Sequence, residues 1–254
     1  FYFATFEKTR MIMKNIFLKF SLFGVVLTTL ITSTGCKKDY TDPTKATEDQ
    51  VFSSAVGLTG VVVGLQRVYT AGRASSEYNS ITINGLVTNE LFVVNTGNTA
   101  EVQLQTGGTA VDPTHTMLAT YWTSNNKIVY DADLVLANAT NLADKNYASG
   151  LIAYASIFKA LSIGNMAMYW ELVPAGTGLN VTFISRVDGF KKAVQVLDNA
   201  IAAVGTNPIS ASFISSVPTG IDITNTLQAL KARYSLFAND LPAALTAANA
   251  VDLT

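Results

Sequence analysis

The stretch Val187-Asp-Gly-Phe-Lys-Lys-Ala-Val-Gln-Val-Leu-Asp-Asn-Ala-Ile-Ala-Ala-Val-Gly205 decides the fold class. Its large apolar side chains recur at alternating intervals of three and four residues, which places them on one face of an α-helix. Gly205 is typical of a residue that ends a helix. The segment therefore predicts an amphipathic helix that needs partners to cover its apolar face. The apolar positions are Val187, Phe190, Val194, Leu197, Ile201 and Val204.

Helical spacing also occurs in earlier segments. Thr47-Glu-Asp-Gln50 fits a capping box, in which a hydroxyl and an amide bind the first free backbone groups of a helix. That helix is predicted to run to about Tyr69. A second helix is predicted from Met117 to the 138–141 stretch, and a third follows it and ends before Pro174.

The last segment, which follows Gly220, resembles one tetratricopeptide unit, a helix-turn-helix of about 34 residues. Asn239 occupies the turn position usually given to glycine, because asparagine tolerates a positive φ. Asp240 can cap the second helix, and Pro242 fits its first turn. With the preceding helices, this segment predicts a mainly α fold of tetratricopeptide-like stacked helical hairpins with long irregular loops. Small residues are expected at the helix contact, at Ala232, Ala244 and Ala248.

Residues 71–116 show no persistent helical spacing. Glycines punctuate a stretch rich in Ser, Thr and Asn, so it is predicted to form loops with short extended pieces at Ile81–Ile83 and Leu91–Val94. Loops of this length inside a helical protein are often functional. Residues 207–220, which contain two prolines, are predicted as a further loop.

Cys36 is the only cysteine in 254 residues. A basic start after Met13, an uncharged core from Phe20 to Ile31 and small residues before Cys36 are typical of a secretory signal. A cysteine directly after the cleavage point is typical of a bacterial lipoprotein. A membrane-spanning helix is disfavoured because it needs about 20 apolar residues, and a buried cysteine is disfavoured because charged residues follow at 37–39. Cys36 is therefore the predicted lipid attachment site.

These features divide the chain into four predicted parts. If Cys36 carries lipid, no thiol remains for a disulfide, so the fold must depend on its hydrophobic core. The first part is interpreted as foreign to the working protein, because Met13 is a better start than Phe1. The parts are a non-native upstream extension (1–12), a lipoprotein signal peptide (13–35), a polar tether (36–46) and an α-helical domain (47–254).

The charge composition argues against nucleic acid as a partner. Lys and Arg total 17 against 18 Asp and Glu, which leaves no basic excess to bind phosphate backbones. Apolar residues make up 49% of the chain and charged residues 14%. This balance predicts a well-filled core and a large apolar contact surface.

The sequence lacks the usual catalytic and metal-binding patterns. His115 is the only histidine, and beside Asp112 and Pro113 it is interpreted as a solvated loop residue. One histidine and one cysteine exclude a zinc site of the usual composition. No nucleophile elbow, phosphate loop or dinucleotide fingerprint occurs. Asp131 and Asp133 are interpreted as solvent-facing. We therefore predict no enzymatic activity, no catalytic residue, no metal and no cofactor.

Aromatic residues are the only feature of the sequence whose chemistry suggests a ligand. Their flat apolar rings suit the C–H face of a sugar, and Trp122 and Trp170 could stack in that way. Both lie in helical patterns, where core packing is the favoured interpretation. Tyr78 and Phe92 lie in the irregular region without a specific signal, so the ligand-binding residues stay unassigned.

Four stretches, in this order, resemble the SusD/RagB family of Bacteroidetes outer-membrane lipoproteins. The likeness spans most of the chain from Cys36 to Val251. Lys159 departs from the family, which usually carries Arg there, and the glycine before Pro174 is absent. Family members are much longer, so the chain is interpreted as an N-terminal portion with its C-terminal part missing. The stretches are Cys36–Tyr40 with the helix over Thr47–Tyr69, Tyr121–Ala137, Ala155–Ala160 leading to Tyr169–Pro174, and Leu230–Asp240.

The resemblance implies a SusD-like fold and transport in place of catalysis. Such proteins sit lipid-anchored on the outer face of the outer membrane, as a lid over a SusC-like TonB-dependent transporter. They capture oligosaccharides, or peptides in some branches, and deliver them to the pore. The partners expected here are such a transporter, an oligosaccharide or peptide ligand, and the membrane through the lipid anchor.

Two alternatives stay open. One is a lipid-anchored, tetratricopeptide-like scaffold that binds other cell-envelope proteins and no nutrient. The other is a fragment without a function of its own. A SusC-like barrel gene directly upstream would favour nutrient capture, whereas an unrelated gene neighbourhood would favour the scaffold.

Overall fold

The computed structural model describes residues 47–253. The predicted upstream extension, signal peptide, lipid attachment site Cys36 and tether lie outside the described residues. The chain divides into two compact units between Ala46 and Thr47, and the helical unit begins at Thr47.

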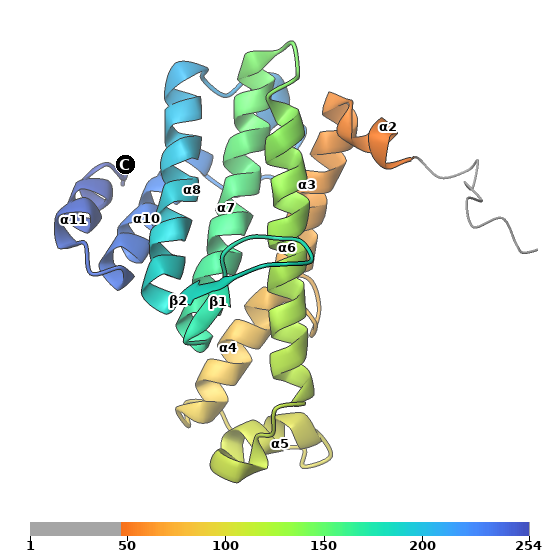
Figure 1. Cartoon of the computed structure of the whole chain (residues 1–254), viewed down its shortest axis with the longest axis vertical. Helices are drawn as coiled ribbons and strands as arrows, with labels where there is room; N and C mark the ends of the chain where they lie inside the picture. The colour runs from red at the N-terminus through yellow and green to blue at the C-terminus, as the bar shows by residue number, and fades with distance from the viewer. Residues whose placement is uncertain (1–46, 254) are drawn as a thin grey trace, which may run out of the picture. The chain divides into compact units, whose positions relative to one another are not determined.

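This unit is mainly α, which confirms the predicted fold class. Consecutive long helices α6, α7 and α8 alternate in direction and pack as neighbours (Figure 1). One antiparallel pair of short strands is the only sheet among residues 47–253. The elements are α2 (Glu48–Phe52), α3 (Ala55–Thr70), α4 (Ser76–Val87), α5 (Thr99–Thr106), a 3₁₀ turn (Gly108–Ala110), α6 (Thr116–Ala139), α7 (Lys145–Tyr169), β1 (Leu172–Pro174), β2 (Phe183–Ser185), α8 (Arg186–Thr206), α9 (Ala211–Ile214), α10 (Ile223–Phe237) and α11 (Leu241–Asn249).

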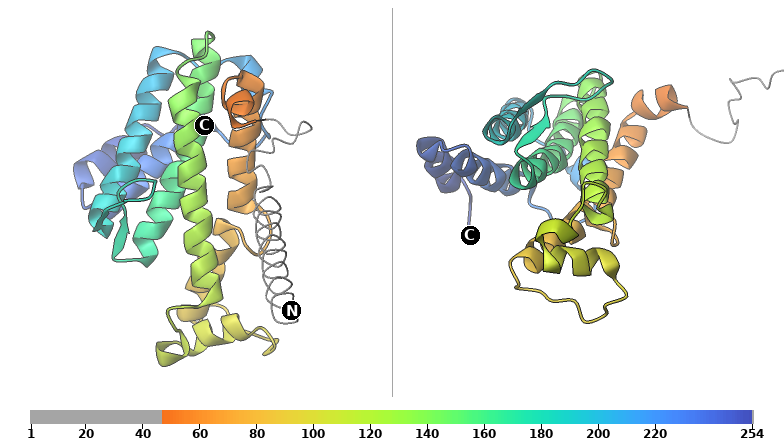
Figure 2. Two further views of the ribbon diagram at one scale, coloured as in Figure 1. Left: turned by 45° about the vertical axis from the view of Figure 1, so that its right-hand side comes forward. Right: turned by 60° about the horizontal axis from the view of Figure 1, so that its bottom comes forward.

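Helix α7 lies in the middle of the unit and contacts α3, α6, α8, α9 and α10. Figure 2 shows α3 and α11 on opposite sides of it. Most of its length is buried on every side, which is what a central core helix requires. Glycines allow the close contacts, because Gly150 lies against the ring of Phe213 and Gly164 against the ring of Tyr234.

In the described part of the chain, α7 alone is long and apolar enough to cross a membrane. However, 78% of its most apolar window is buried inside the helical unit. The apolar character of α7 is therefore explained by its neighbours, as in the core helix of a helical bundle.

Helix α8 confirms the helix predicted from the opening stretch. Phe190 and Leu197 are buried, and α8 packs on α7 and α10. The prediction for Gly205 was wrong, because the helix continues past it and Gly205 has no positive φ. The helix ends at Thr206, and the backbone of its C-cap residue Asn207 is extended. Asn207 precedes Pro208, and a residue before proline is driven away from the helical conformation.

The first predicted helix begins as expected but is divided in two. The Gln50 backbone N–H donates to the Thr47 hydroxyl, and the Thr47 N–H donates to the Gln50 carboxamide at 2.9 Å, which confirms the capping box. Ser54 then caps α3 by accepting a hydrogen bond from the N–H of Gly57. A Cβ on Gly57 would lie 2.1 Å from the carbonyl oxygen of Val51, so the bend between α2 and α3 requires glycine.

The prediction of loops was wrong for residues 76–87 and 99–106, which form α4 and α5, whereas residues 88–98 between them are irregular as predicted. Residues 81–83, predicted as extended, lie inside α4. The Ser, Thr and Asn residues of α4 have low helix propensity, and contacts with α3, α5 and α6 override it. Ile83 of α4, Leu104 of α5 and Tyr121 of α6 form a second, smaller core there.

The loop predicted at 207–220 contains the short helix α9. Phe213 of α9 is completely buried. Its ring lies edge-on to Tyr147 at 5.4 Å and to Tyr154 at 6.2 Å, measured between centroids. This segment therefore contributes to the main core of the unit.

The hairpin of α10 and α11 confirms the predicted turn. Asn239 has a φ of 63°, the Asp240 side chain accepts a hydrogen bond from the Ala243 N–H at 3.1 Å, and Pro242 lies in the first turn of α11. The buried small residue of α11 is Ala247. Ala248, predicted to pack against α10, is exposed, because the packing face lies one position earlier.

Candidate functional site

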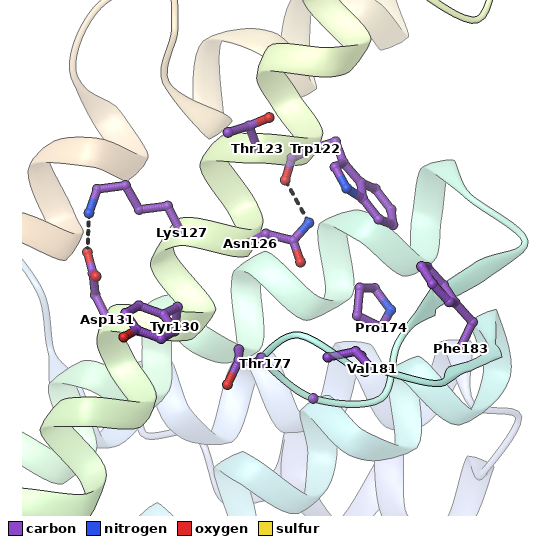
Figure 3. Close-up of a pocket in the computed structure, with 12 residues that line it drawn as sticks. Trp122, Thr123, Asn126, Lys127, Tyr130, Asp131, Pro174, Thr177, Val181 and Phe183 are labelled. Carbon is purple, nitrogen blue, oxygen red and sulfur yellow. Dashed lines mark hydrogen bonds and ion pairs between the residues drawn. The ribbon is translucent and has the colours of Figure 1, made fainter. Parts of the chain in front are cut away.

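A groove of about 640 Å³ opens between helix α6 and the β1–β2 hairpin (Figure 3). Helix α6 supplies two rows of side chains, each with members four residues apart, so that they share one face of the helix. The hairpin supplies the opposite wall. The lining residues are Trp122, Asn126 and Tyr130 in one row, Thr123, Lys127 and Asp131 in the other, and Pro174, Gly176, Thr177, Gly178, Val181 and Phe183 from the hairpin.

Three aromatic side chains line this groove. Trp122 is half-buried, whereas Tyr130 is 49% exposed and Phe183 is 56% exposed. Trp122 and Phe183 come from opposite walls, and their ring planes lie within 12° of parallel with centroids 6.4 Å apart. Trp122 also packs edge-on against Trp170 at 4.9 Å, which fixes the orientation of its indole.

Trp170, the other tryptophan considered from the sequence, does not line the groove. It caps the C-terminus of α7 and lies 5.8 Å from the ring of Tyr121. Burial strongly raises the pKa of the Tyr121 phenol, so the phenol stays neutral beside the Trp170 indole. Trp170 therefore packs in the core, as predicted. Trp122 packs against Trp170 and also faces the groove.

The polar groups of the groove come mainly from α6. The Asn126 side-chain N–H donates to the Trp122 carbonyl at 2.9 Å, which leaves its Oδ1 as an acceptor. Lys127 Nζ pairs with Asp131 Oδ2 at 2.6 Å, one helical turn away. The prediction that Asp131 simply faces solvent was wrong, because it is paired with Lys127 and lines the groove.

A second group of charges lies beside the hairpin. Asp133 Oδ1 pairs with Lys159 of α7, and Asp133 Oδ2 accepts a hydrogen bond from the Thr177 hydroxyl at 3.1 Å. Lys192 of α8 donates to the Ala175 carbonyl. Desolvation lowers the pKa of Lys192, with repulsion from Lys159 acting in the same direction and Asp133 opposing both. Asp133, predicted to be solvent-facing, therefore connects two helices to the hairpin.

His115, predicted as a solvated loop residue, is buried at 3% exposure, so that prediction was wrong. It caps α6 by accepting a hydrogen bond from the Leu118 N–H at 3.5 Å. Its other ring nitrogen lies 3.0 Å from the carbonyl oxygen of Ala100, in α5. The imidazole therefore joins α5 to α6 and lies away from the groove lining.

Tyr78 and Phe92 line a separate, smaller pocket of about 450 Å³. An ion pair between Arg73 and Glu101 lies in its lining, and the Arg73 guanidinium lies 5.7 Å from the centroid of the Tyr78 ring. Phe92 is 75% exposed. This pocket is smaller than the groove, and neither tryptophan lines it.

The groove combines flat apolar rings with amide, hydroxyl and charged groups. Its volume falls in the range of about 300–1,000 Å³ that is typical of small-molecule sites. A pyranose has an apolar C–H face and a rim of hydroxyls, which match the rings and the polar groups. Within residues 47–253, no group of three or more His, Cys, Asp and Glu side chains could hold a metal ion.

Sequence reasoning missed several lining residues. Asn126 and Tyr130 follow Trp122 at intervals of four in a correctly predicted helix, so a face-by-face reading of that helix would have grouped them. No sequence pattern indicates Phe183 and Thr177 as lining residues, because their position beside α6 depends on how the hairpin folds back.

Comparisons with protein-family models, with curated proteins and with solved structures found no match to this chain. The groove and the sequence resemblance are therefore the two grounds for a function.

Proposed function

We propose that this protein captures an oligosaccharide without cleaving it and passes it to a SusC-like TonB-dependent transporter, as a lipid-anchored protein on the outer face of the outer membrane. The observation that carries the capture step is the groove in which Trp122, Tyr130 and Phe183 lie beside Asn126. The membrane location and the transporter rest on Cys36 and on the SusD/RagB resemblance.

The groove supports sugar binding by its shape as well as its chemistry. Stacking of aromatic rings on sugar C–H groups removes apolar surface from water on both partners. Hydroxyls at the rim of the sugar can then donate to Asn126 Oδ1 and to Asp131. Because the groove is open, a longer chain can extend beyond it.

The acidic groups favour capture over hydrolysis. Glycosidases use two carboxyl groups about 5–9.5 Å apart, one of which donates a proton to the leaving oxygen. In the described part of the chain, Asp131 is the one carboxylic acid that lines the groove, and it is paired with Lys127. This arrangement supports a binding protein.

Trp122→Ala is expected to weaken oligosaccharide binding about tenfold, or roughly 1.4 kcal/mol, because it removes the largest ring surface in the groove. Tyr130→Ala should also weaken binding, and its side chain is exposed enough to be removed without disturbing the core. A glycan array would select the oligosaccharide, and calorimetry would measure its dissociation constant.

Phe92→Ala is the matched control, since it removes an exposed aromatic side chain outside the groove and should leave the dissociation constant unchanged. Equal affinity in the wild type and in both groove variants would contradict the proposed site. Release of shorter sugars by the pure protein would contradict capture without cleavage.

Cys36→Ser is expected to abolish labelling by a palmitate analogue and to release the protein from the membrane fraction, because the thiol is the proposed point of lipid attachment. Lys38→Ser, two residues later, should keep the label. Recovery of unmodified wild-type protein from the cytosol would rule out the proposed anchor and, with it, the location.

A second candidate function is the envelope scaffold without a nutrient ligand. The observation that favours it is a set of exposed apolar side chains on the hairpin of α10 and α11: Leu236, Phe237, Leu241 and Leu245. A gene for a SusC-like barrel directly upstream would support capture, and an unrelated gene neighbourhood would support the scaffold.

A further inference from the structure

The β1–β2 hairpin forms one wall of the groove but has little support of its own. Its strands pair over only three residues each, and an isolated two-stranded ribbon is marginally stable in water. Val173 is its one fully buried side chain and packs against Gly189 of α8. The connecting residues 175–182 project away from this anchor, and Leu179 at their tip is fully exposed.

Two hydrogen bonds join residues 175–182 to the helices of the described unit. Thr177 donates its hydroxyl proton to Asp133 of α6, and the Ala175 carbonyl accepts from Lys192 of α8. Both bonds hold the β1 end of the segment, at Ala175 and Thr177, and Thr177 itself lines the groove. The position of the wall therefore depends on groups that lie outside the groove lining.

The two hydrogen bonds, from Thr177 to Asp133 and from Lys192 to Ala175, form the attachment of the hairpin to the helices. The charged side chains in this attachment influence one another. Asp133 is the carboxylate that pairs with Lys159, whose side chain is 12% exposed, and it also offsets part of the repulsion that Lys159 exerts on Lys192. Loss of the Asp133 charge would leave two partly buried ammonium groups close together, which is unfavourable. The hydrogen bonds to Thr177 and Ala175 would weaken together.

We infer that Asp133 and Lys192 are positioning residues, which hold the hairpin wall at the distance from α6 that the ligand requires and raise affinity without touching the ligand. The inference rests on the proposed function for its effect on affinity. Lys159, at the position where the SusD/RagB family usually carries Arg, supplies the counter-charge that orients Asp133.

Hydrogen exchange of the ligand-free protein tests the attachment directly. Asp133→Asn and Lys192→Met are expected to speed amide exchange in residues 174–183 about tenfold, because the hairpin opens locally more often. Exchange in the buried core of α7 should stay unchanged in Lys192→Met, and in Asp133→Asn, where Lys159 of α7 loses its counter-charge, it should rise less than exchange in the hairpin. Thr177→Val removes one hydrogen bond at an exposed position and should speed exchange in the same residues by a smaller factor.

Asp198→Asn is the matched control. Asp198 of α8 pairs with Lys231 of α10 at 2.6 Å, so this variant also breaks a bond between helices but lies outside the attachment. It should leave exchange of the hairpin as in the wild type. Hairpin exchange at the wild-type rate in Asp133→Asn and Lys192→Met would overturn the inference, and so would an equal increase in Asp198→Asn.

Oligosaccharide affinity, measured on the same variants, separates this inference from the proposed function. Asp133→Asn and Lys192→Met are expected to weaken binding about three- to tenfold, with no change in Asp198→Asn. Faster hairpin exchange with unchanged affinity would overturn the positioning role. If the wild type binds no oligosaccharide although the variants loosen the hairpin, the proposed function fails and the attachment stands.

Discussion

Replacement of Phe213 by alanine is expected to lower the free energy of unfolding by about 3–5 kcal/mol. The ring is completely buried and lies edge-on to Tyr147 and Tyr154. It also fills the space over Gly150, where an added Cβ would lie 2.3 Å from the ring. Its removal would leave a cavity between α7 and α9 that these large neighbours cannot fill.

Urea denaturation followed by circular dichroism at 222 nm measures this effect, with the slope of the transition checked for two-state behaviour. Phe92→Ala is the control, because Phe92 is 75% exposed and its removal should change stability by less than about 0.5 kcal/mol. If the two variants lose equal stability, α9 does not contribute to the core in the way described.

Gly164→Ala is expected to destabilise the protein by about 1–3 kcal/mol, although alanine is the better helix former. A Cβ at this position would lie 2.2 Å from a ring carbon of Tyr234. Tyr234 is completely buried and is stacked on Phe190 with ring centroids 6.2 Å apart, so its ring has little room to move. The added methyl group would therefore push α10 away from α7.

Gly205→Ala provides a comparison with the same chemical change. Gly205 lies in the last turn of α8 with no atom within 4 Å of an added Cβ, so alanine there should stabilise by about 0.5–1 kcal/mol. Thermal unfolding midpoints of the two variants should move in opposite directions. A rise in both midpoints would show that α7 and α10 do not meet as closely as the structure shows.

These core contacts also explain why the groove lies where it does. The hairpin leaves α7 at its C-terminal end and returns the chain to α8, and Val173 occupies the space over Gly189. Packing of α6 and α8 on either side of α7 then brings the hairpin alongside the face of α6 that carries Trp122.

Local sequence predicted the long helices well and the short ones poorly. Helices α6, α7 and α8 were predicted because their apolar residues repeat with the helical period. The α10–α11 hairpin was predicted because Asn239 suits the positive φ of its turn. Helix α4 was missed because its Ser, Thr and Asn residues are weak helix formers. Helix α9 was missed because four residues cannot show a period.

The candidate site was predicted only in part. Trp122 was named as a ring that could stack on a sugar, but core packing was preferred, because a helical pattern does not show which of its faces stays uncovered. His115 was placed in solvent because its neighbours Asp112 and Pro113 are typical of a loop. In the structure it is buried by α5, an element that the sequence did not indicate.

The sequence by itself determined that the described unit is helical and which residues share a helix face, because backbone hydrogen bonds and side-chain period are local properties of the chain. Only the tertiary structure decided that one face of α6 stays open opposite Phe183, and that Asp133 reaches both Lys159 and Thr177. These pairings join residues that are distant in sequence, and they depend on how closely α6, α7 and α8 pack, which no local pattern encodes.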